Sequence, residues 1–401
     1  MPLDTGDTSF MLVATALVMI MTPGLAFFYG GLVSRKNVLT IMMQSYVSMG
    51  VSTILWVVVG YSLCFSGDVG GIIGNLDMAF LRGIEITDLG GLNDTIPLLL
   101  FVAYQMMFAI ITPALITGAF ANRITFKAYL IFLVAWQILV YYPFVHMIWG
   151  GGMLYEWGVL DFAGGIVVHA LAGMAALASV IYVGKRGVED AGPHNVPFVA
   201  IGAALLWFGW FGFNAGSELA VDEVTAVAFI NTQIAAAFAA ITWLLLAWRH
   251  DGKPSFVEML IGMIAGLATI TPAAGFVSPQ SAMLIGVAAG AVCYFAVVFR
   301  KNKGLDDALD VWGVHGVGGA LGIVMLGVLA SESIGGQNGL YHGNQDFFVV
   351  QLAGLALACV WAFAFTYGML MMIDKVTPVR VSEEAEAALD VTLHGESAYT
   401  D

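Results

Sequence analysis

Long apolar runs, separated by short polar or Gly/Pro-containing stretches, occupy almost the whole chain. Most are about 20 residues or longer, the length that an α-helix needs to cross the hydrocarbon core of a bilayer. Lipid offers no partners to backbone polar groups, so these runs are expected to be helical. They lie at residues 10–33, 38–65, 97–121, 128–148, 162–184, 197–217, 224–248, 256–275, 281–299, 310–330 and 347–373. The pattern predicts an all-α integral membrane protein with eleven transmembrane helices.

The basic residues predict how these helices are oriented. An odd number of spans places the two termini on opposite sides of the membrane. Thirteen of the fourteen Lys and Arg residues then fall on the side of the C-terminus, and only Arg82 falls on the other. Because cytoplasmic loops carry the excess of basic residues, the N-terminus is expected outside and the C-terminus in the cytoplasm. The main alternative is an even number of helices, which would scramble this distribution.

The composition agrees with this reading and excludes other classes of protein. Of the 401 residues, 60% are hydrophobic and 10% are charged, against about 25% charged in an ordinary soluble domain. These values exclude a soluble globular protein, a disordered chain and a nucleic-acid binder. We expect a multi-pass protein of the plasma membrane, surrounded by the lipid bilayer. Its outer face carries acids almost unopposed, which can concentrate cations or serve solubility and topology alone.

Two spans carry the same polar pattern. Asp161 starts one span and His169 follows among glycines, while Asp310 starts another and is followed by His315. The two spans lie five helices apart, so the second runs through the membrane in the opposite direction. This is typical of an inverted-topology repeat, which places the functional site between its halves. We predict halves at 10–184 and 197–330, with 347–373 as an additional helix.

The chain therefore divides into a transmembrane domain, residues 1–377, and a cytoplasmic tail, residues 378–401. From residue 381 onward the tail has six acids and no Lys or Arg. It is either a solvated tail or an ordered segment that docks on the cytoplasmic loops.

The intramembrane histidines are the first candidates for chemistry. His169 and His315 lie well inside spans, whereas the other histidines lie in loops, at span ends or in the tail. Ionisable groups at this depth are costly and usually functional. A histidine pair can pass a proton along; the alternative is a packing role. Asp161 is expected to cap a helix N-terminus, and Asp310 is interpreted in the same way.

Aromatic residues form a second constellation. Trp149 ends the fourth span, the third span carries Phe108, and the sixth ends with Trp210, Phe213 and Ser217. Interfacial aromatics usually form a membrane belt, but Gly, Asn and Ser beside the rings indicate a cavity. Ring faces together with a hydroxyl suit a small cation. No intramembrane Lys or Arg, nucleotide loop, zinc motif or nucleophile–base pair is found in the sequence, so neither a cofactor nor enzymatic activity is expected.

Four motifs resemble the ammonium transporter (Amt/Mep/Rh) family, and its bacterial and archaeal Amt branch more than Rh. They are PGLAFFYGG at 23–31, DFAGG at 161–165 running to His169, GWFGFNAGS at 209–217, and VHG at 314–316. The resemblance extends from about residue 10 to the end. Ala388 and Tyr104 depart from it, standing where glycine and phenylalanine respectively are usual.

The resemblance implies roles for individual residues. It implies an outer ammonium site at Trp149, Ser217 and Phe108, with Asp161 in support. It implies a gate of two stacked rings, Phe108 and Phe213, and an apolar conduit in which His169 and His315 face each other. Further pore-lining positions are implied at Phe28, Tyr29, Trp210 and Val314.

The resemblance also implies a function and partners. We expect transport of ammonium or ammonia, with methylammonium as an analogue, through an apolar pore within each subunit of a homotrimer. The cation would be recruited outside and deprotonated. A PII-type signalling protein binds the cytoplasmic face of many members. The alternative is an ammonium sensor with little flux, and whether net charge crosses is left open.

Overall fold

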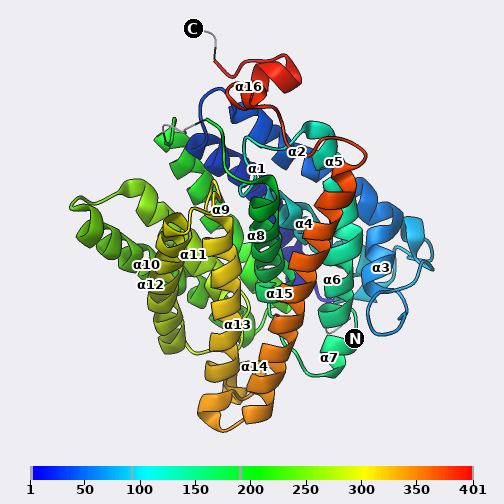
Figure 1. The fold of residues 1–401 in the computed structure, drawn as a ribbon. Coiled ribbons are helices and arrows are strands. Elements are labelled where there is room, and N and C mark those ends of the chain that lie inside the picture. The colour runs from blue at the N-terminus through cyan, green and yellow to red at the C-terminus, as the bar shows by residue number, and fades with distance from the viewer. Residues whose placement is uncertain (1–2, 92–93, 189–191, 400–401) are drawn as a thin grey trace.

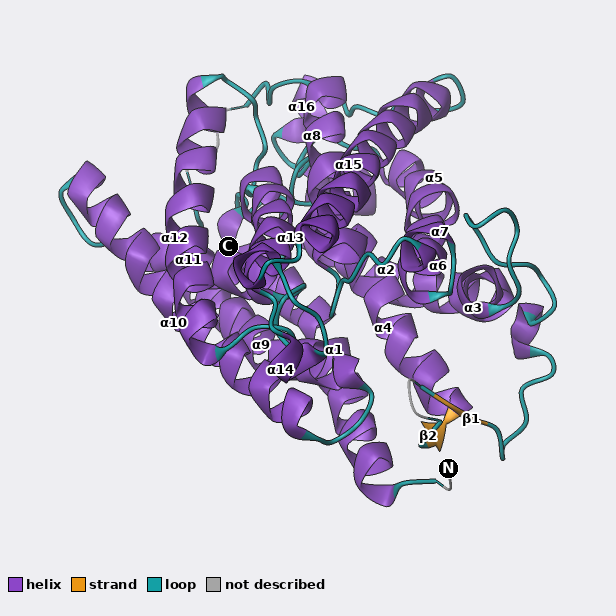
Figure 2. Cartoon of the chain, turned by 90° about the horizontal axis from the view of Figure 1, so that it is seen from below, coloured by secondary structure: helices purple, strands orange, loops and turns teal. Residues whose placement is uncertain are grey.

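The computed structural model describes residues 3–91, 94–188 and 192–399, and it is a bundle of helices packed side by side (Figures 1 and 2). The long helices are α1 (Thr5–Leu32), α2 (Val38–Leu55), α4 (Leu98–Ile116), α5 (Phe126–Trp136), α6 (Tyr142–Trp149), α8 (Leu171–Val183), α9 (Val196–Ala215), α10 (Glu223–Asp251), α11 (Phe256–Ile270), α12 (Pro279–Asn302), α13 (Val317–Leu329) and α15 (Gln345–Asp374).

Short elements join or extend these helices. They are α3 (Tyr61–Phe65), α7 (Met153–Glu156), α14 (Glu332–Gly335), α16 (Glu383–Glu386), and the strands β1 (Leu89–Gly90) and β2 (Ile96–Pro97), which pair antiparallel with Leu89 opposite Pro97. Within the described residues, π-helical turns lie at Trp56–Gly60, Gln137–Tyr141, Gly165–Ala170, Trp312–Gly316 and Asp390–His394. In the same ranges, 3₁₀ turns lie at Ala79–Leu81, Gly216–Glu218 and Leu340–His342.

Ten helical stretches in the described ranges are long and apolar enough to cross a membrane. The predicted span 256–275 is shorter in the structure, because α11 ends at Ile270 and leaves 15 residues. At about 1.5 Å per residue this helix covers less than the hydrocarbon thickness. It is buried among other helices from Gly262 onward. The all-α membrane fold is confirmed, and the count of eleven stays a prediction.

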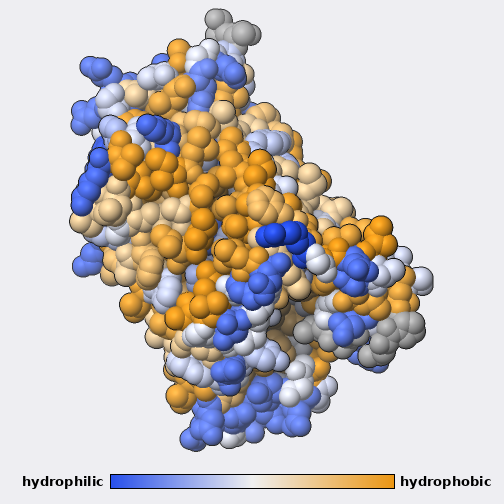
Figure 3. Space-filling model, turned by 90° about the vertical axis from the view of Figure 1, so that its right-hand side faces the viewer, coloured by the Kyte–Doolittle hydropathy of each residue, from blue (hydrophilic) through white to orange (hydrophobic). Residues whose placement is uncertain are grey.

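The surface agrees with a membrane environment. On the face shown in Figure 3, apolar side chains fill the middle of the molecule and polar side chains gather toward its upper and lower ends. Large apolar side chains such as Leu12, Phe208 and Phe295 are more than half exposed. Such a contiguous apolar surface is stable in lipid and not in water.

The termini lie at opposite ends of the bundle. Near the N-terminus, the Asp7 carboxylate accepts a hydrogen bond from Val221 at the end where α9 stops. At the other end, the tail contacts the residues that join α1 to α2. This arrangement fits an odd number of crossings. Which end faces the cytoplasm stays a prediction.

Glycines let the central helices approach closely. A Cβ added to Gly202 on α9 would lie 2.2 Å from the backbone nitrogen of Phe28 on α1. One added to Gly173 on α8 would lie 2.0 Å from the Cα of Gly316. Small residues at such contacts are typical of membrane helix packing. The contact between Gly173 and Gly316 brings together the two π-helical turns that carry His169 and His315, as the predicted repeat requires. The inverted symmetry itself stays a prediction.

The tail is ordered and docked, which is the second of the two alternatives. The Asp390 carboxylate accepts hydrogen bonds from the backbone N–H groups of Leu39 (3.0 Å) and Thr40 (2.8 Å), so it caps the start of α2. The Asn37 side chain binds the tail backbone at Glu386 and Leu389. A residue near the C-terminus thereby caps a helix whose Thr40 lies 350 residues earlier in the chain.

The interpretation of Asp310 as a helix cap is wrong. Its carboxylate pairs with Arg300, whose Nε lies 2.9 Å away. The capping group is Asp307, which accepts the backbone N–H of Trp312 at 2.7 Å. Asp310 itself has φ 58°, a left-handed backbone unlike the extended one of an N-cap.

Candidate functional site

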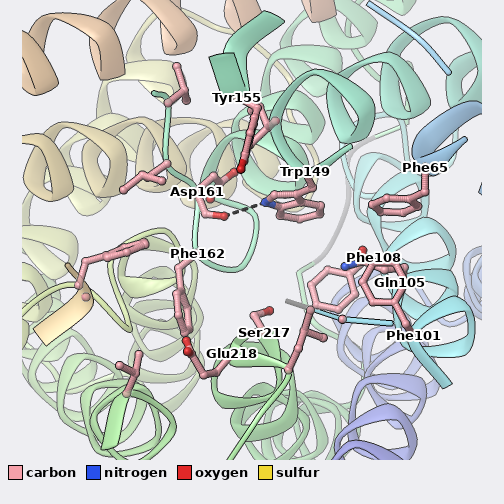
Figure 4. Close-up of a pocket in the computed structure, with 18 of the residues that line it drawn as sticks. Phe65, Phe101, Gln105, Phe108, Trp149, Tyr155, Asp161, Phe162, Ser217 and Glu218 are labelled. Atoms are coloured by element: carbon pink, nitrogen blue, oxygen red, sulfur yellow. Dashed lines mark hydrogen bonds between the residues drawn. The ribbon is translucent and has the colours of Figure 1, made fainter. Parts of the chain in front are cut away.

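A cavity of about 450 Å³ opens at the end of the bundle that holds the N-terminus; we call it the outer cavity (Figure 4). Its walls are mostly apolar, with several aromatic rings and a few polar groups. They include Phe65, Phe101, Gln105, Phe108, Trp149, Tyr155, Asp161, Phe162, Ser217 and Glu218. A concave, largely apolar space with few convergent polar groups is typical of a small-ligand site.

Trp149 lies at the last position of α6 and faces this cavity. Its indole N–H donates a hydrogen bond to the backbone carbonyl of Asp161 at 2.8 Å. Its ring meets that of Phe108 edge to face, with centroids 6.1 Å apart. The hydrogen bond satisfies the polar edge of the indole and leaves a ring face toward the cavity, which is the geometry a cation–π contact needs.

Ser217 lies just past the end of α9. Its hydroxyl donates to the backbone carbonyl of Phe213 at 2.8 Å, which leaves its lone pairs free to accept. The Tyr104 hydroxyl lies 3.2 Å from Ser217 Oγ and also reaches the carbonyls of Gly212 and Phe213. The tyrosine that departs from the family pattern therefore braces this helix end. The partial negative charge at a helix C-terminus also favours a cation here.

Asp161 lines the outer cavity, but its carboxylate is fully occupied. The two oxygens accept the backbone N–H groups of Gly164 (3.0 Å), Gly165 (2.6 Å), Ile166 (2.8 Å) and Val167 (3.0 Å). Burial raises the pKa of this carboxyl, and the four backbone hydrogen bonds oppose the rise. Asp161 acts through its backbone, by holding Trp149, as well as by capping the helix that carries His169.

Two tilted aromatic rings in contact lie at the inner end of the outer cavity. The centroids of Phe108 and Phe213 lie 4.4 Å apart at an angle of 37°. Both side chains are buried, and Phe108 lines the outer cavity while Phe213 lines a second, deeper one. The ring pair lies where the resemblance places a gate, and its gating role stays a prediction.

The deeper space, which we call the inner cavity, holds the histidine pair. Nδ1 of His169 lies 3.2 Å from Nδ1 of His315, and the two rings are nearly parallel. One Nδ1 must donate and the other accept, so the two imidazoles take complementary protonation states. Within the described part of the chain, Nε2 of His169 has no hydrogen-bond partner. The pair can therefore accept or release a proton along one line.

The inner cavity is narrow, with room of about 10 Å³. Phe28, Tyr29 and Trp210 line it, and the pore-lining role that the resemblance gives them stays a prediction. The Trp210 ring stacks on His169 with centroids 5.4 Å apart, and its N–H donates to Thr271. Val314 is buried beside His315 but is not part of this lining, so its predicted pore-lining position has no support here.

The sequence interpretation missed several cavity residues. Phe162, Tyr155 and Glu218 line the outer cavity, yet none of the three was predicted as a site residue. The sequence did hold a signal for two of them, because they stand next to predicted site residues. Phe162 follows Asp161 directly, and Glu218 follows Ser217.

Comparison with known proteins decides the family. The family model described as Ammonium Transporter Family matches residues 9–399. The chain belongs to this family. An ammonium transporter of Bacillus subtilis is 46% identical over all of both chains, and Amt1 of Archaeoglobus fulgidus is 44% identical over 99% of this chain and all of its own. The predicted kinship with ammonium transporters, and with bacterial and archaeal relatives among them, is confirmed.

Solved structures agree with the fold. Mep2 of Candida albicans superposes with a TM-score of 0.89 at 35% identity, over 95% of this chain and 87% of its own. A protein described as a sensor Amt protein superposes with a TM-score of 0.90 at 29% identity, over 97% and 98%. The chain is thus a multi-pass membrane protein of a transporter family.

Proposed function

We propose that this ammonium transporter recruits the cation in the outer cavity and removes its water and its proton behind Phe108 and Phe213. Neutral ammonia then passes inward along the histidine pair, which takes up the proton. The observation that carries the proposal is the order of the parts. Phe108 and Phe213 lie between a cavity with aromatic rings and a hydroxyl and a cavity that holds the buried histidine pair.

Recruitment rests on Trp149 and Ser217. A cation–π contact is worth about 0.5–2 kcal/mol, and the serine oxygen can accept an N–H from ammonium. Neither contact separates ammonium from potassium well, since both cations are monovalent and similar in size. Selection must therefore occur deeper in the pore.

Selection rests on the cost of charge in the inner cavity. Moving an intact ion into such an apolar space costs several kcal/mol even after relaxation. Ammonium avoids this cost by giving up its proton, and potassium cannot. The ring nitrogens of His169 and His315 can take up the proton and can hydrogen-bond the neutral ammonia. Neither histidine adds a fixed charge to the cavity.

Uptake by the full chain in proteoliposomes tests the proposal. Radiolabelled methylammonium should accumulate along an imposed gradient and saturate, while rubidium should not. Vesicles without protein supply the leak rate. Rubidium uptake equal to that of methylammonium would contradict deprotonation as the basis of selection.

An ammonium sensor is the second candidate. The likeness to a sensor Amt protein and the tail that caps α2 favour it. The same vesicles discriminate the two: saturable binding of methylammonium with uptake no faster than the leak would favour the sensor.

We also infer a homotrimer in the plasma membrane, with a PII-type protein as a partner of the cytoplasmic face. Support comes from the family likeness and the lateral apolar surface. Light scattering of the purified protein, with and without a PII-type protein, tests both: a monomer mass, or a mass unchanged by the added protein, would contradict the corresponding inference.

A further inference from the structure

One carboxylate in the outer cavity has no part in the function described so far. Glu218 follows Ser217 directly and lines the same cavity. Its side chain is half-buried, and in Figure 4 it lies beside Phe162, across the cavity from Trp149. A half-buried carboxylate beside a cation site changes the potential that an incoming ion meets.

The backbone fixes the position of Glu218. It ends the 3₁₀ turn Gly216–Glu218, and the next residue, Leu219, has φ 58°. A left-handed conformation is uncommon for a residue other than glycine and makes a sharp end to the helix. Leu219 is buried and lines the cavity too. Glu218 is therefore held at a set place relative to Ser217.

The Glu218 carboxylate, in contrast to that of Asp161, is not held by basic side chains or backbone N–H groups in residues 3–91, 94–188 and 192–399. Burial raises the pKa of this carboxyl, and the neighbouring Asp222 carboxylate, with which it shares a hydrogen bond, raises the pKa further. A cation bound nearby would favour the charged form of Glu218. The C-terminal end of α9 adds partial negative charge of the same sign. The deficit of positive charge at this place suits a cation.

We propose that Glu218 is a specificity-determining residue of the outer site, which draws monovalent cations to Trp149 and Ser217 and favours ammonium over neutral ammonia. It acts through its charge, while the ring and the hydroxyl make the direct contacts. This inference rests on the proposed outer site. It concerns how strongly the cation is attracted to that site and not how ammonia passes along the histidines.

Glu218→Gln tests the proposal, because it removes the charge and keeps the shape. The matched control is Glu223→Gln, which removes an acid five residues away that is exposed and does not line the cavity. Both full-length variants are compared with the wild type by methylammonium uptake in proteoliposomes and by calorimetric binding of methylammonium to purified protein.

Glu218→Gln should raise the half-saturation and dissociation constants about three- to ten-fold, as expected for a nearby charge at intermediate dielectric. The maximal rate should change less than the half-saturation, and Glu223→Gln should change neither constant by that much. Equal effects of the two variants on binding would overturn the proposal. Binding that weakens in Glu218→Gln while the wild type shows no uptake would support this inference and contradict transport.

Discussion

At the scale of single residues, the proposed function gives Trp149 two roles. Its ring faces the outer cavity, and its N–H fixes the loop at Asp161 through a 2.8 Å hydrogen bond. The Asp161 carboxylate in turn holds four backbone N–H groups at the start of the helix that carries His169. One indole thus connects cation recruitment to the placement of the histidine pair.

Trp149→Leu should therefore weaken the apparent affinity for methylammonium several-fold, since a cation–π contact contributes about 0.5–2 kcal/mol. Uptake kinetics in vesicles measure it. Trp157→Leu is the control, because Trp157 is half-exposed and does not line the outer cavity. Unchanged half-saturation in Trp149→Leu would remove this residue from the site.

Sequence reasoning about single residues has its clearest signal where membrane burial makes a polar group expensive, and the roles it gives to such residues stay predictions. His169, His315 and Ser217 stand out because an apolar run gives them no other reason to be polar. It failed where only spatial proximity decides. Asp310 and Asp307 lie three residues apart and both precede the helix, so the sequence could not tell which one caps it and which one pairs with Arg300.

At the scale of elements, contact between glycines sets the distance between the histidines. The backbone at Gly173 touches that at Gly316, next to His315. The apolar pattern predicts that both helices exist. It could not predict this contact, because a glycine in a membrane helix is common and its neighbour is far away in the sequence.

Gly173→Ala should separate α8 from the turn Trp312–Gly316, because the new Cβ would lie 2.0 Å from the Gly316 Cα. We expect a lower thermal midpoint in detergent and loss of most uptake. Gly368→Ala is the control, since a Cβ there meets nothing within 4 Å. A Gly173→Ala protein as stable and active as this control would show that the close approach is not needed.

The tail gives a second prediction for an element. Asp390→Ala removes a cap from α2, and loss of such a cap costs about 0.5–2 kcal/mol. The tail should then become sensitive to limited proteolysis, and uptake or its regulation should fall. Glu384→Ala, at an exposed position of α16, is the control. Equal protease resistance in the two variants would show that the Asp390 cap does not hold the tail.

At the scale of the whole molecule, the account depends on two spaces of different character in series. The outer cavity is roomy and has polar groups, whereas the inner one is narrow and apolar. Composition and apolar periodicity predicted the membrane fold, and the family resemblance predicted the site. The volumes of the two spaces could not be predicted, because they depend on how side chains from distant helices pack.

The central claim is that the neutral histidine pair rejects ions that cannot lose a proton. The decisive measurement is the potassium current through protein reconstituted in defined bilayers, for the wild type and for His169→Asp. We predict no potassium current in the wild type and a clear current in His169→Asp, because a fixed carboxylate can solvate the ion in the conduit. Continued exclusion of potassium by His169→Asp, in a protein that still binds methylammonium, would contradict the claim and place selection in the outer cavity.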